Sequence, residues 1–215
     1  MKAAPERGRA LAAVLSYGWA YDLAQYLLGA SRTRRWLQRD FMQARAGERV
    51  LDVGCGTADI LSVLPDGLDY VGCDVSERYI ARARARWGHL GRFYVQDVDD
   101  VGRGSPGGFD LILATGLLHH LDDAQASLLF QTLATALNPG GRIVTVDCCF
   151  VERQNRIARF LIEHDRGQYV RTPQKFTALA QAALPDVRGW LVHRRWVPYT
   201  YWIMRARHDA GRSRR

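Results

Sequence analysis

Long hydrophobic runs are absent from this 215-residue chain. The longest strongly apolar run, from Leu111 to Leu118, is far shorter than the roughly 20 residues that a membrane-spanning helix needs. A second stretch, Ala10 to Ala20, follows two arginines, but its serine and aromatic residues make it too polar for a typical export signal. We therefore expect neither a membrane span nor export.

Cysteine is also scarce, with four residues in the chain. Cys55, Cys73, Cys148 and Cys149 form no C-x-x-C pair, and none has a histidine at the spacing of a metal site. This pattern favours neither a zinc centre nor a disulfide framework. A reducing cytoplasm is the expected location, and no metal is expected.

Lysine is nearly missing, since 28 of the 30 basic residues are arginine. The net charge is +8, with 9 basic and 4 acidic residues in 1–49 and 8 basic and 1 acidic in 188–215. Basic ends permit a nucleic-acid partner. An arginine bias can also follow from genome base composition, so we expect a small-molecule partner before a nucleic acid.

What the chain does contain is a series of short β-prone runs separated by helical stretches. Alternation of this kind predicts a parallel sheet with helices on its faces. Two further β-prone runs follow, joined by a turn too short for a crossover helix, so they should pair antiparallel. The seven expected strands are Arg49–Val53, Asp69–Cys73, Arg92–Val95, Asp110–Ala114, Arg142–Val146, Trp190–Trp196 and Tyr199–Ala206.

The length of the chain is enough for one substantial core, so we expect a single domain over 1–215. Ser76 should cap a helix after the second strand, and Thr172 with Pro173 should begin a helix that buries Phe176, Leu179 and Leu184. The expected parts are an N-terminal helical cap (1–48), a cofactor-binding core (49–147), an insertion or lid with a helix (150–185), a hairpin (188–207) and a basic tail (208–215).

The segment VLDVGCGTAD, residues 50–59, ends the first strand in a glycine turn. Glycines let the backbone approach a ligand closely. A dinucleotide fingerprint would have a third glycine where Asp59 stands, and the carboxylates of Asp52 and Asp59 would repel a pyrophosphate. They suit a cation instead, and S-adenosylmethionine (SAM) carries both an ammonium and a sulfonium group.

Two more acidic residues follow the next strands of the expected sheet. Asp74 lies 20 residues after Gly54, where a carboxylate can accept both hydroxyls of a ribose; a helix cap is the alternative. Asp97 can accept a hydrogen bond from an adenine amino group, with Val75 and Val98 covering the ring. These positions extend the predicted SAM site along the sheet edge.

The segments VLDVGCGTAD, VGCDVSERYIARAR, QDV, FDLILATGLLHHLDD and LNPGGRIVTVD resemble the successive motifs of class I SAM-dependent methyltransferases. The resemblance implies an α/β, Rossmann-like three-layer sandwich with strand order 3-2-1-4-5-7-6, strand 7 antiparallel, and added N-terminal helices. It also implies SAM as cofactor and S-adenosylhomocysteine as product. The cofactor contacts expected in all are Tyr21, Asp52, Gly54, Cys55, Gly56, Asp74, Val75, Asp97, Val98 and Thr115.

Candidate catalytic residues are His119 and His120, which follow the fourth strand at the edge where such sheets bind ligands. Histidine can take a proton near neutral pH. In similar methyltransferases the first of these positions often faces the substrate, while the second is often a histidine with a structural hydrogen bond. Packing or positioning is the alternative role for His119.

Acceptor contacts are expected from Tyr17, on the first helix, and from Arg166, Tyr169 and Arg171, in the insertion. The insertion shapes acceptor specificity in related enzymes. We expect O- or C-methylation of a small molecule, such as a natural product or saccharide intermediate, by a monomer or homodimer. An RNA methyltransferase and a SAM-binding protein without turnover are the alternatives.

Overall fold

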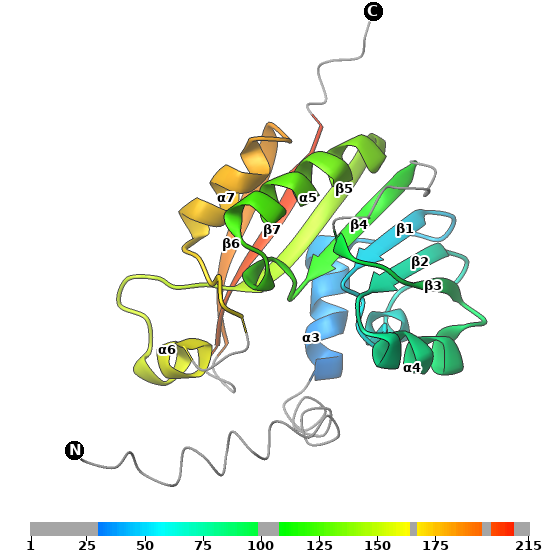
Figure 1. Ribbon diagram of the computed structural model, residues 1–215, viewed down its shortest axis with the longest axis horizontal. Coiled ribbons are helices and arrows are strands. Elements are labelled where there is room, and N and C mark those ends of the chain that lie inside the picture. The colour runs from blue at the N-terminus through cyan, green and yellow to red at the C-terminus, as the bar shows by residue number, and fades with distance from the viewer. Residues whose placement is uncertain (1–29, 99–107, 164–166, 195–198, 209–215) are drawn as a thin grey trace, which may run out of the picture.

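The computed structural model describes residues 30–98, 108–163, 167–194 and 199–208 (Figure 1). The first helix of the expected N-terminal cap, with Tyr17 and Tyr21, lies outside these ranges. The same holds for Arg166, for the turn at Val197 and Pro198, and for the basic tail from residue 209. Within the described part, no helix is both long and apolar enough to cross a membrane.

Seven strands form one sheet in the order β3-β2-β1-β4-β5-β7-β6 (Figure 1). The strands β1 to β5 pair parallel, whereas β7 is antiparallel to both β5 and β6. This confirms the predicted Rossmann-like architecture. The strand bounds are β1 Arg49–Val53, β2 Asp69–Asp74, β3 Gly91–Val95, β4 Phe109–Thr115, β5 Leu137–Cys148, β6 Asp186–Arg194 and β7 Tyr199–Arg207.

Two strands, β5 and β6, begin several residues earlier than the sequence pattern predicts. β5 starts at Leu137 instead of Arg142, because Leu137 already pairs with Phe109 of β4. The pairing then shifts, so that Arg142 lies opposite Leu111, and the residues between form a bulge that contains Gly140 at φ +81°. The polar residues of the bulge hide this part of the strand from a pattern search. β6 likewise starts at Asp186, four residues before the expected position.

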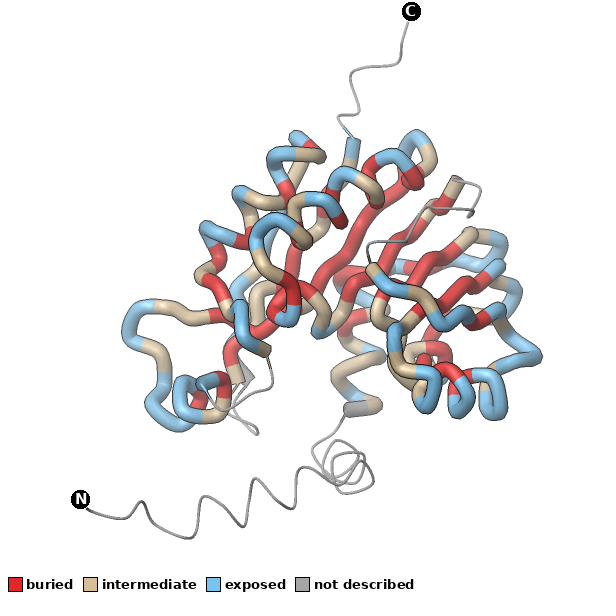
Figure 2. The backbone as a smooth tube through the Cα atoms, viewed as in Figure 1, coloured by how far each residue is buried: buried red, intermediate tan, exposed pale blue. Residues whose placement is uncertain are grey.

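Helices cover both faces of the sheet, and the strands between them are buried (Figures 1 and 2). On one face, α5 (Asp123–Ala136) and α7 (Pro173–Gln181) pack on a core that includes Phe130, Leu133 and Phe176. The other face carries α3 (Ala30–Leu37), the π-helical turn η1 (Gln38–Met42) and α4 (Glu77–Trp87). Its core includes Met42 and Ile80.

Local capping chemistry agrees with the sequence. Ser76 Oγ accepts the N–H of Tyr79 at the start of α4, and Thr172 Oγ1 accepts the N–H of Lys175 at the start of α7. The crossover between β1 and β2 has the expected length but less helix than expected, since the structure assigns it only the 3-10 turn η2 (Asp59–Ser62). Pro65 disfavours helical backbone at the residue before it, which limits a longer helix here.

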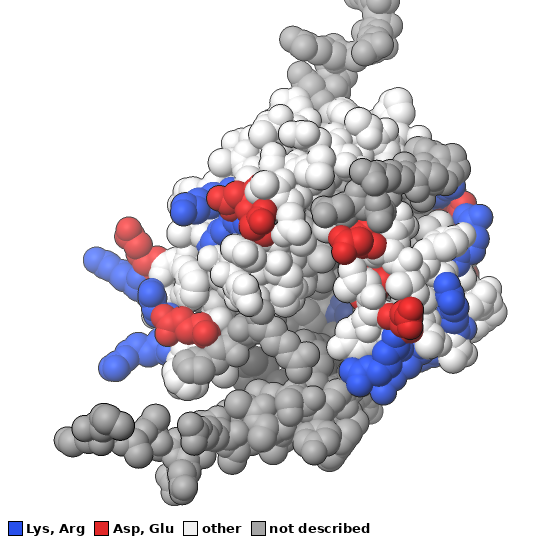
Figure 3. All heavy atoms as spheres, viewed as in Figure 1, with Lys and Arg blue, Asp and Glu red and all other residues white. Residues whose placement is uncertain are grey.

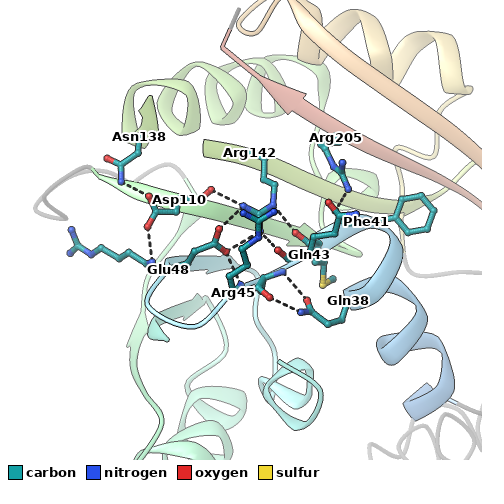
Figure 4. Close-up of polar contacts among 12 residues, drawn as sticks. Gln38, Phe41, Gln43, Arg45, Glu48, Asp110, Asn138, Arg142 and Arg205 are labelled. Atoms are coloured by element: carbon teal, nitrogen blue, oxygen red, sulfur yellow. Dashed lines mark hydrogen bonds and ion pairs between the residues drawn. The ribbon is translucent and has the colours of Figure 1, made fainter. Parts of the chain in front are cut away.

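A buried arginine fastens η1 to the amino-terminal edge of the sheet (Figure 4). Arg142 of β5 donates from Nε to the carbonyl of Met42 at 2.6 Å and from Nη2 to that of Gln43 at 2.6 Å. Its guanidinium also pairs with Glu48 at 2.9 Å. Burial raises the pKa of Glu48, but the hydrogen bonds from Arg142 and the Arg45 N–H outweigh this and hold it below its usual value. The opposite, carboxyl-terminal edge is left for the predicted site.

Candidate cofactor and active site

The glycine turn after β1 is open to a ligand at one glycine and packed at the other. Gly54 and Gly56 both have positive φ angles, of +69° and +57°. A Cβ atom at Gly54 would lie 3.1 Å from a methyl group of Leu117, whereas one at Gly56 would meet no described atom within 4 Å. The backbone at Gly56 is therefore accessible, as the predicted cofactor requires.

Beneath this turn, Asp52 is held by a residue of the neighbouring strand. The Tyr70 hydroxyl donates a hydrogen bond of 2.6 Å to Asp52 Oδ2, and both residues are buried. Gly72 lies opposite Asp52 in the β1–β2 pair. A Cβ atom at Gly72 would lie 3.1 Å from the Tyr70 ring and 2.9 Å from Cys55 Sγ. Glycine at position 72 thus makes room for the phenol to reach the carboxylate.

The other carboxylate oxygen, Asp52 Oδ1, is buried and has no hydrogen-bond partner among the described residues. The pKa of Asp52 is raised to about 7. Burial is the main cause of the rise, the hydrogen bond from Tyr70 opposes it, and the charge of Asp74 adds to it. A cation near Oδ1 would satisfy this oxygen and stabilise the ionised carboxylate. The site therefore fits the ammonium end of SAM and does not fit a pyrophosphate.

Asp74 ties the glycine turn to the start of α4. Its Oδ2 accepts the Gly56 N–H at 2.9 Å, and its Oδ1 accepts the Ser76 N–H at 2.8 Å. Each carboxylate oxygen has a further lone pair for a ligand hydroxyl. The next residue, Val75, has 64% of its surface exposed. An apolar side chain this exposed beside a carboxylate suits a ligand with a sugar and an aromatic ring.

Asp59 does not act as expected at the glycine turn. Its carboxylate pairs with Arg86 of α4 at 2.7 Å and with Arg34 of α3 at 3.5 Å. It also accepts a hydrogen bond from Thr57 Oγ1. Two cations already neutralise Asp59, so the prediction that it would attract a cationic ligand is wrong. The ion pairs instead join the turn to the two helices on this face.

The remaining predicted cofactor residues lie along the same edge. Asp97 is exposed just after β3. The preceding residue, Gln96, donates its backbone N–H to the backbone carbonyl of Asp74 at 3.0 Å, which holds this loop beside β2. Val98 packs against the core. Cys55 is half-buried, and burial raises the pKa of its thiol far above the usual range, so it stays neutral. Thr115 is half-buried at the end of β4.

The two histidines after β4 differ in a way that the sequence did not predict. His119 is buried: its Nδ1 lies 2.9 Å from Asp147 Oδ1, and its backbone N–H donates to the same oxygen at 3.2 Å. His120 is exposed, with its ring 4.2 Å from that of His119. His119 is thus positioned by two contacts to one carboxylate oxygen of Asp147. Sequence reasoning missed Asp147, although it is a carboxylate near the end of a buried strand.

Two glycines border the far edge of the His119 ring, on either side of Nε2. A Cβ atom at Gly116 would lie 3.8 Å from Cε1, and one at Gly167 would lie 2.1 Å from Cδ2. The segment after α6 (Arg156–Glu163) is also held here, because the Tyr169 N–H donates to the His119 carbonyl at 3.0 Å. The insertion therefore closes over the histidine loop with main-chain contacts.

Arg171 has a structural task in place of its expected acceptor contact. It is buried, and Nη1 donates to the carbonyls of Leu118 and Tyr169, each at 2.9 Å. Nη2 donates to the Leu121 carbonyl, while Nε and Nη2 both lie 2.7 Å from Asp123. These contacts occupy all three nitrogens of the guanidinium. Arg171 thus fixes the histidine loop to the insertion.

Tyr169 remains available for a ligand, with 41% of its surface exposed. Tyr17, Tyr21 and Arg166 lie outside the described residues. In the view of Figure 3, basic side chains lie mainly over α6 and α4, and acidic side chains lie among them. This face therefore does not form a continuous basic surface.

Comparisons with known proteins agree with this geometry. Residues 51–143 match a family model described as "Methyltransferase domain". The chain is 32% identical over 130 residues to a demethylmenaquinone methyltransferase of Beutenbergia cavernae, covering 59% of this chain and 52% of that protein. It is 32% identical over 102 residues to a ubiquinone biosynthesis O-methyltransferase of Xanthomonas euvesicatoria, covering 46% and 42%. The chain thus spans about half the length of these relatives.

The fold also matches solved structures. One is the N-methyltransferase NodS from Bradyrhizobium japonicum in complex with S-adenosylhomocysteine, with a TM-score of 0.70. The match covers 94% of this chain and 97% of NodS at 19% identity. At this identity, the match supports the fold alone.

Proposed function

We propose that this chain, whose residues 51–143 match a methyltransferase domain, is a class I SAM-dependent methyltransferase that methylates a small-molecule acceptor at oxygen or carbon. The observation that carries the proposal is the arrangement at the carboxyl edge of the sheet. The glycine turn is open at Gly56, and one oxygen of the buried Asp52 carboxylate has no hydrogen-bond partner among the described residues. Beside this turn lies the loop that carries His119, which Asp147 holds in place. The first feature suits the methyl donor and the second suits an acceptor.

The cofactor roles follow from the positions of the polar atoms. Asp52 Oδ1 would accept from the ammonium group, and the Asp74 carboxylate would accept from the ribose hydroxyls. Val75 and Val98 would cover the adenine ring, and Asp97 would accept from its amino group. Bound SAM supplies a methyl group that is already activated by its attachment to a cationic sulfur. The protein therefore has mainly to align the acceptor and exclude water.

His119 is the best candidate for accepting a proton from an acceptor hydroxyl. A carboxylate can only accept hydrogen bonds, so Asp147 selects the tautomer of His119 with its proton on Nδ1. The lone pair then lies on Nε2, at the ring edge bordered by Gly116 and Gly167. The exposed ring of His120 would line the approach. Carbon acceptors that are already acidic would need this base less.

The acceptor class rests on the relatives named above. By their names, one relative is a demethylmenaquinone methyltransferase and the other is an O-methyltransferase of ubiquinone biosynthesis, which supports a small organic acceptor. Natural-product and saccharide intermediates remain the proposed classes. Tyr17, Arg166 and Tyr169 stay predicted acceptor contacts. We further propose a cytoplasmic monomer or homodimer, in keeping with four free cysteines.

Isothermal titration of SAM into the purified protein tests the proposal first. We expect binding that Asp74→Asn weakens by at least tenfold. The exposed Asp66 of the β1–β2 connection provides a matched control, because Asp66→Asn removes the same charge away from the site. Wild-type protein without affinity for SAM would refute the cofactor and with it the reaction.

Transfer of labelled methyl groups from SAM into cell extract tests the acceptor class. Label in the small-molecule fraction supports the proposal, whereas label in RNA would support the alternative of an RNA methyltransferase. The chain shows no separate RNA-binding module in its sequence, which favours the first outcome. SAM binding without any transfer would indicate a non-catalytic SAM-binding protein.

A further inference from the structure

Three arginines surround a small cavity on the terminal hairpin, away from the methyltransferase site. Arg188 of β6 and Arg205 and Arg207 of β7 line a space of about 60 Å³ together with Asp186. In the β6–β7 register, Arg188 lies directly opposite Arg205, and Asp186 lies opposite Arg207. The cavity therefore has three positive charges and one negative charge.

Two donors in this cluster are buried without a partner. The Nε atoms of Arg205 and Arg207 have no hydrogen-bond partner among the described residues. The Arg205 guanidinium is held in place at Nη2, which donates to the carbonyls of Phe41 and Asp40 in η1 (Figure 4). Buried polar groups are nearly always paired, so two orphaned guanidinium N–H groups in one cluster require an acceptor.

The charges in the cluster repel one another. Like charges directly opposite on neighbouring strands are destabilising. Burial lowers the pKa of Arg205, and Arg207, Arg142 and Arg188 lower it further. Of these, Arg142 is already neutralised by Glu48. The carboxylate of Asp186 compensates only in part, since it lies 3.7 Å from Arg188 and 41% of it is exposed.

We propose that Arg188, Arg205 and Arg207 bind a phosphate group, either as inorganic phosphate or as part of a small phosphorylated molecule. Guanidinium groups match the oxygen geometry of phosphate and form charge-assisted hydrogen bonds to it. The small cavity has room for one such group. Arg205 contacts η1 next to the Arg142–Glu48 pair, at the amino edge of the sheet, so the ligand would bind apart from the SAM site.

Titration with sodium phosphate, against chloride at equal ionic strength, tests the site without depending on methyl transfer. We expect saturable binding and a rise in the thermal midpoint of unfolding, because the anion relieves the repulsion. Arg207→Gln should weaken binding at least tenfold, whereas Arg78→Gln, on the exposed face of α4, should leave it unchanged. Arg205 is unsuitable for substitution because its contacts to η1 support the fold.

Asp186→Asn gives the sharpest result, since it removes the only negative charge in the cluster. Phosphate affinity should rise severalfold in this variant if the cluster is an anion site. Unchanged phosphate affinity in both Arg207→Gln and Asp186→Asn would overturn the proposal. The third measurement uses a short single-stranded RNA. Salt-sensitive RNA binding that depends on Arg207, without binding of free phosphate, would overturn the phosphate proposal in favour of a nucleic-acid site.

Discussion

Tyr70 and Asp52 form a buried hydrogen bond of 2.6 Å across the β1–β2 pair, directly below the glycine turn. The phenol occupies one carboxylate oxygen and leaves the other, Oδ1, buried without a hydrogen-bond partner among the described residues. A hydrogen bond to an ionised group favours ionisation. Tyr70 therefore keeps Asp52 closer to the charged form that a cationic ligand needs.

Removal of the Tyr70 hydroxyl should weaken SAM binding at neutral pH. Burial raises the pKa of Asp52 to about 7, and the Tyr70 hydrogen bond works against this rise. In Tyr70→Phe the pKa should lie higher, so more of the carboxylate is protonated at pH 7. A rise of one pKa unit, from about 7 to about 8, lowers the ionised fraction at pH 7 by about fivefold. SAM affinity measured by calorimetry from pH 6 to 9 should therefore fall about fivefold at pH 7 and recover as the pH rises.

The exposed Tyr94 of β3 is the control for this experiment, and Tyr94→Phe should retain wild-type affinity at each pH. If Tyr70→Phe loses affinity equally at every pH, the hydroxyl supports structure without tuning Asp52.

Asp52→Asn should separate stability from cofactor binding. A folded-state pKa of about 7, above the usual 3.8, means that the folded protein holds a proton that the unfolded chain releases. Stability is therefore lost as the pH rises from about 4 to 7. Asparagine keeps an acceptor for Tyr70 and has no charge, so unfolding at pH 8 should cost roughly 2–4 kcal/mol more than in the wild type. SAM affinity should fall at the same time. A variant that is less stable at pH 8 would contradict this account.

The elements that the sequence predicted are those fixed by neighbouring residues. Apolar runs and glycine turns located the strands, and Ser76 and Thr172 marked helix starts because a cap acts within three residues. The strand order came from the family resemblance. Pairings between distant residues, in contrast, depend on register. Asp52 meets Tyr70 18 positions away and His119 meets Asp147 28 positions away, and no local pattern reports either contact.

The Asp59 and Arg171 predictions failed for a related reason. Both were identified by charge and position along the chain, but charge alone does not reveal which partners have already been used. Asp59 is paired by arginines of two helices, and the Arg171 guanidinium is filled by one carboxylate and three carbonyls. Competing partners of this kind become visible only in three dimensions.

His119 and His120 should differ in their effect on turnover. His119→Asn should lower kcat about 100-fold on a hydroxyl acceptor, which is typical for loss of a general base, while His120→Asn should have a smaller effect. Asp147→Asn should act through His119: the amide no longer fixes the Nδ1–H tautomer, so kcat falls and KM changes little. NMR signals of the His119 ring nitrogens would report the tautomer directly. An unchanged tautomer of His119 in Asp147→Asn would assign Asp147 to folding alone.

Arg171→Lys tests whether the insertion and the histidine loop form one unit. Lysine keeps the charge but has three donors on one nitrogen, so it cannot serve the carbonyls of Leu118, Leu121 and Tyr169 together with Asp123. Buried carbonyls left without a donor should destabilise the fold by about 2–3 kcal/mol in chemical unfolding. Amide exchange should also quicken in residues 118–121 and 167–171 together, while SAM affinity stays near the wild-type value because Asp52 and Asp74 are untouched. Arg159→Lys is the control, because it changes an exposed ion pair with Glu163 on α6. It should alter neither the free energy of unfolding nor the rate of amide exchange. Faster exchange in only one of the two segments would mean that Arg171 does not couple them.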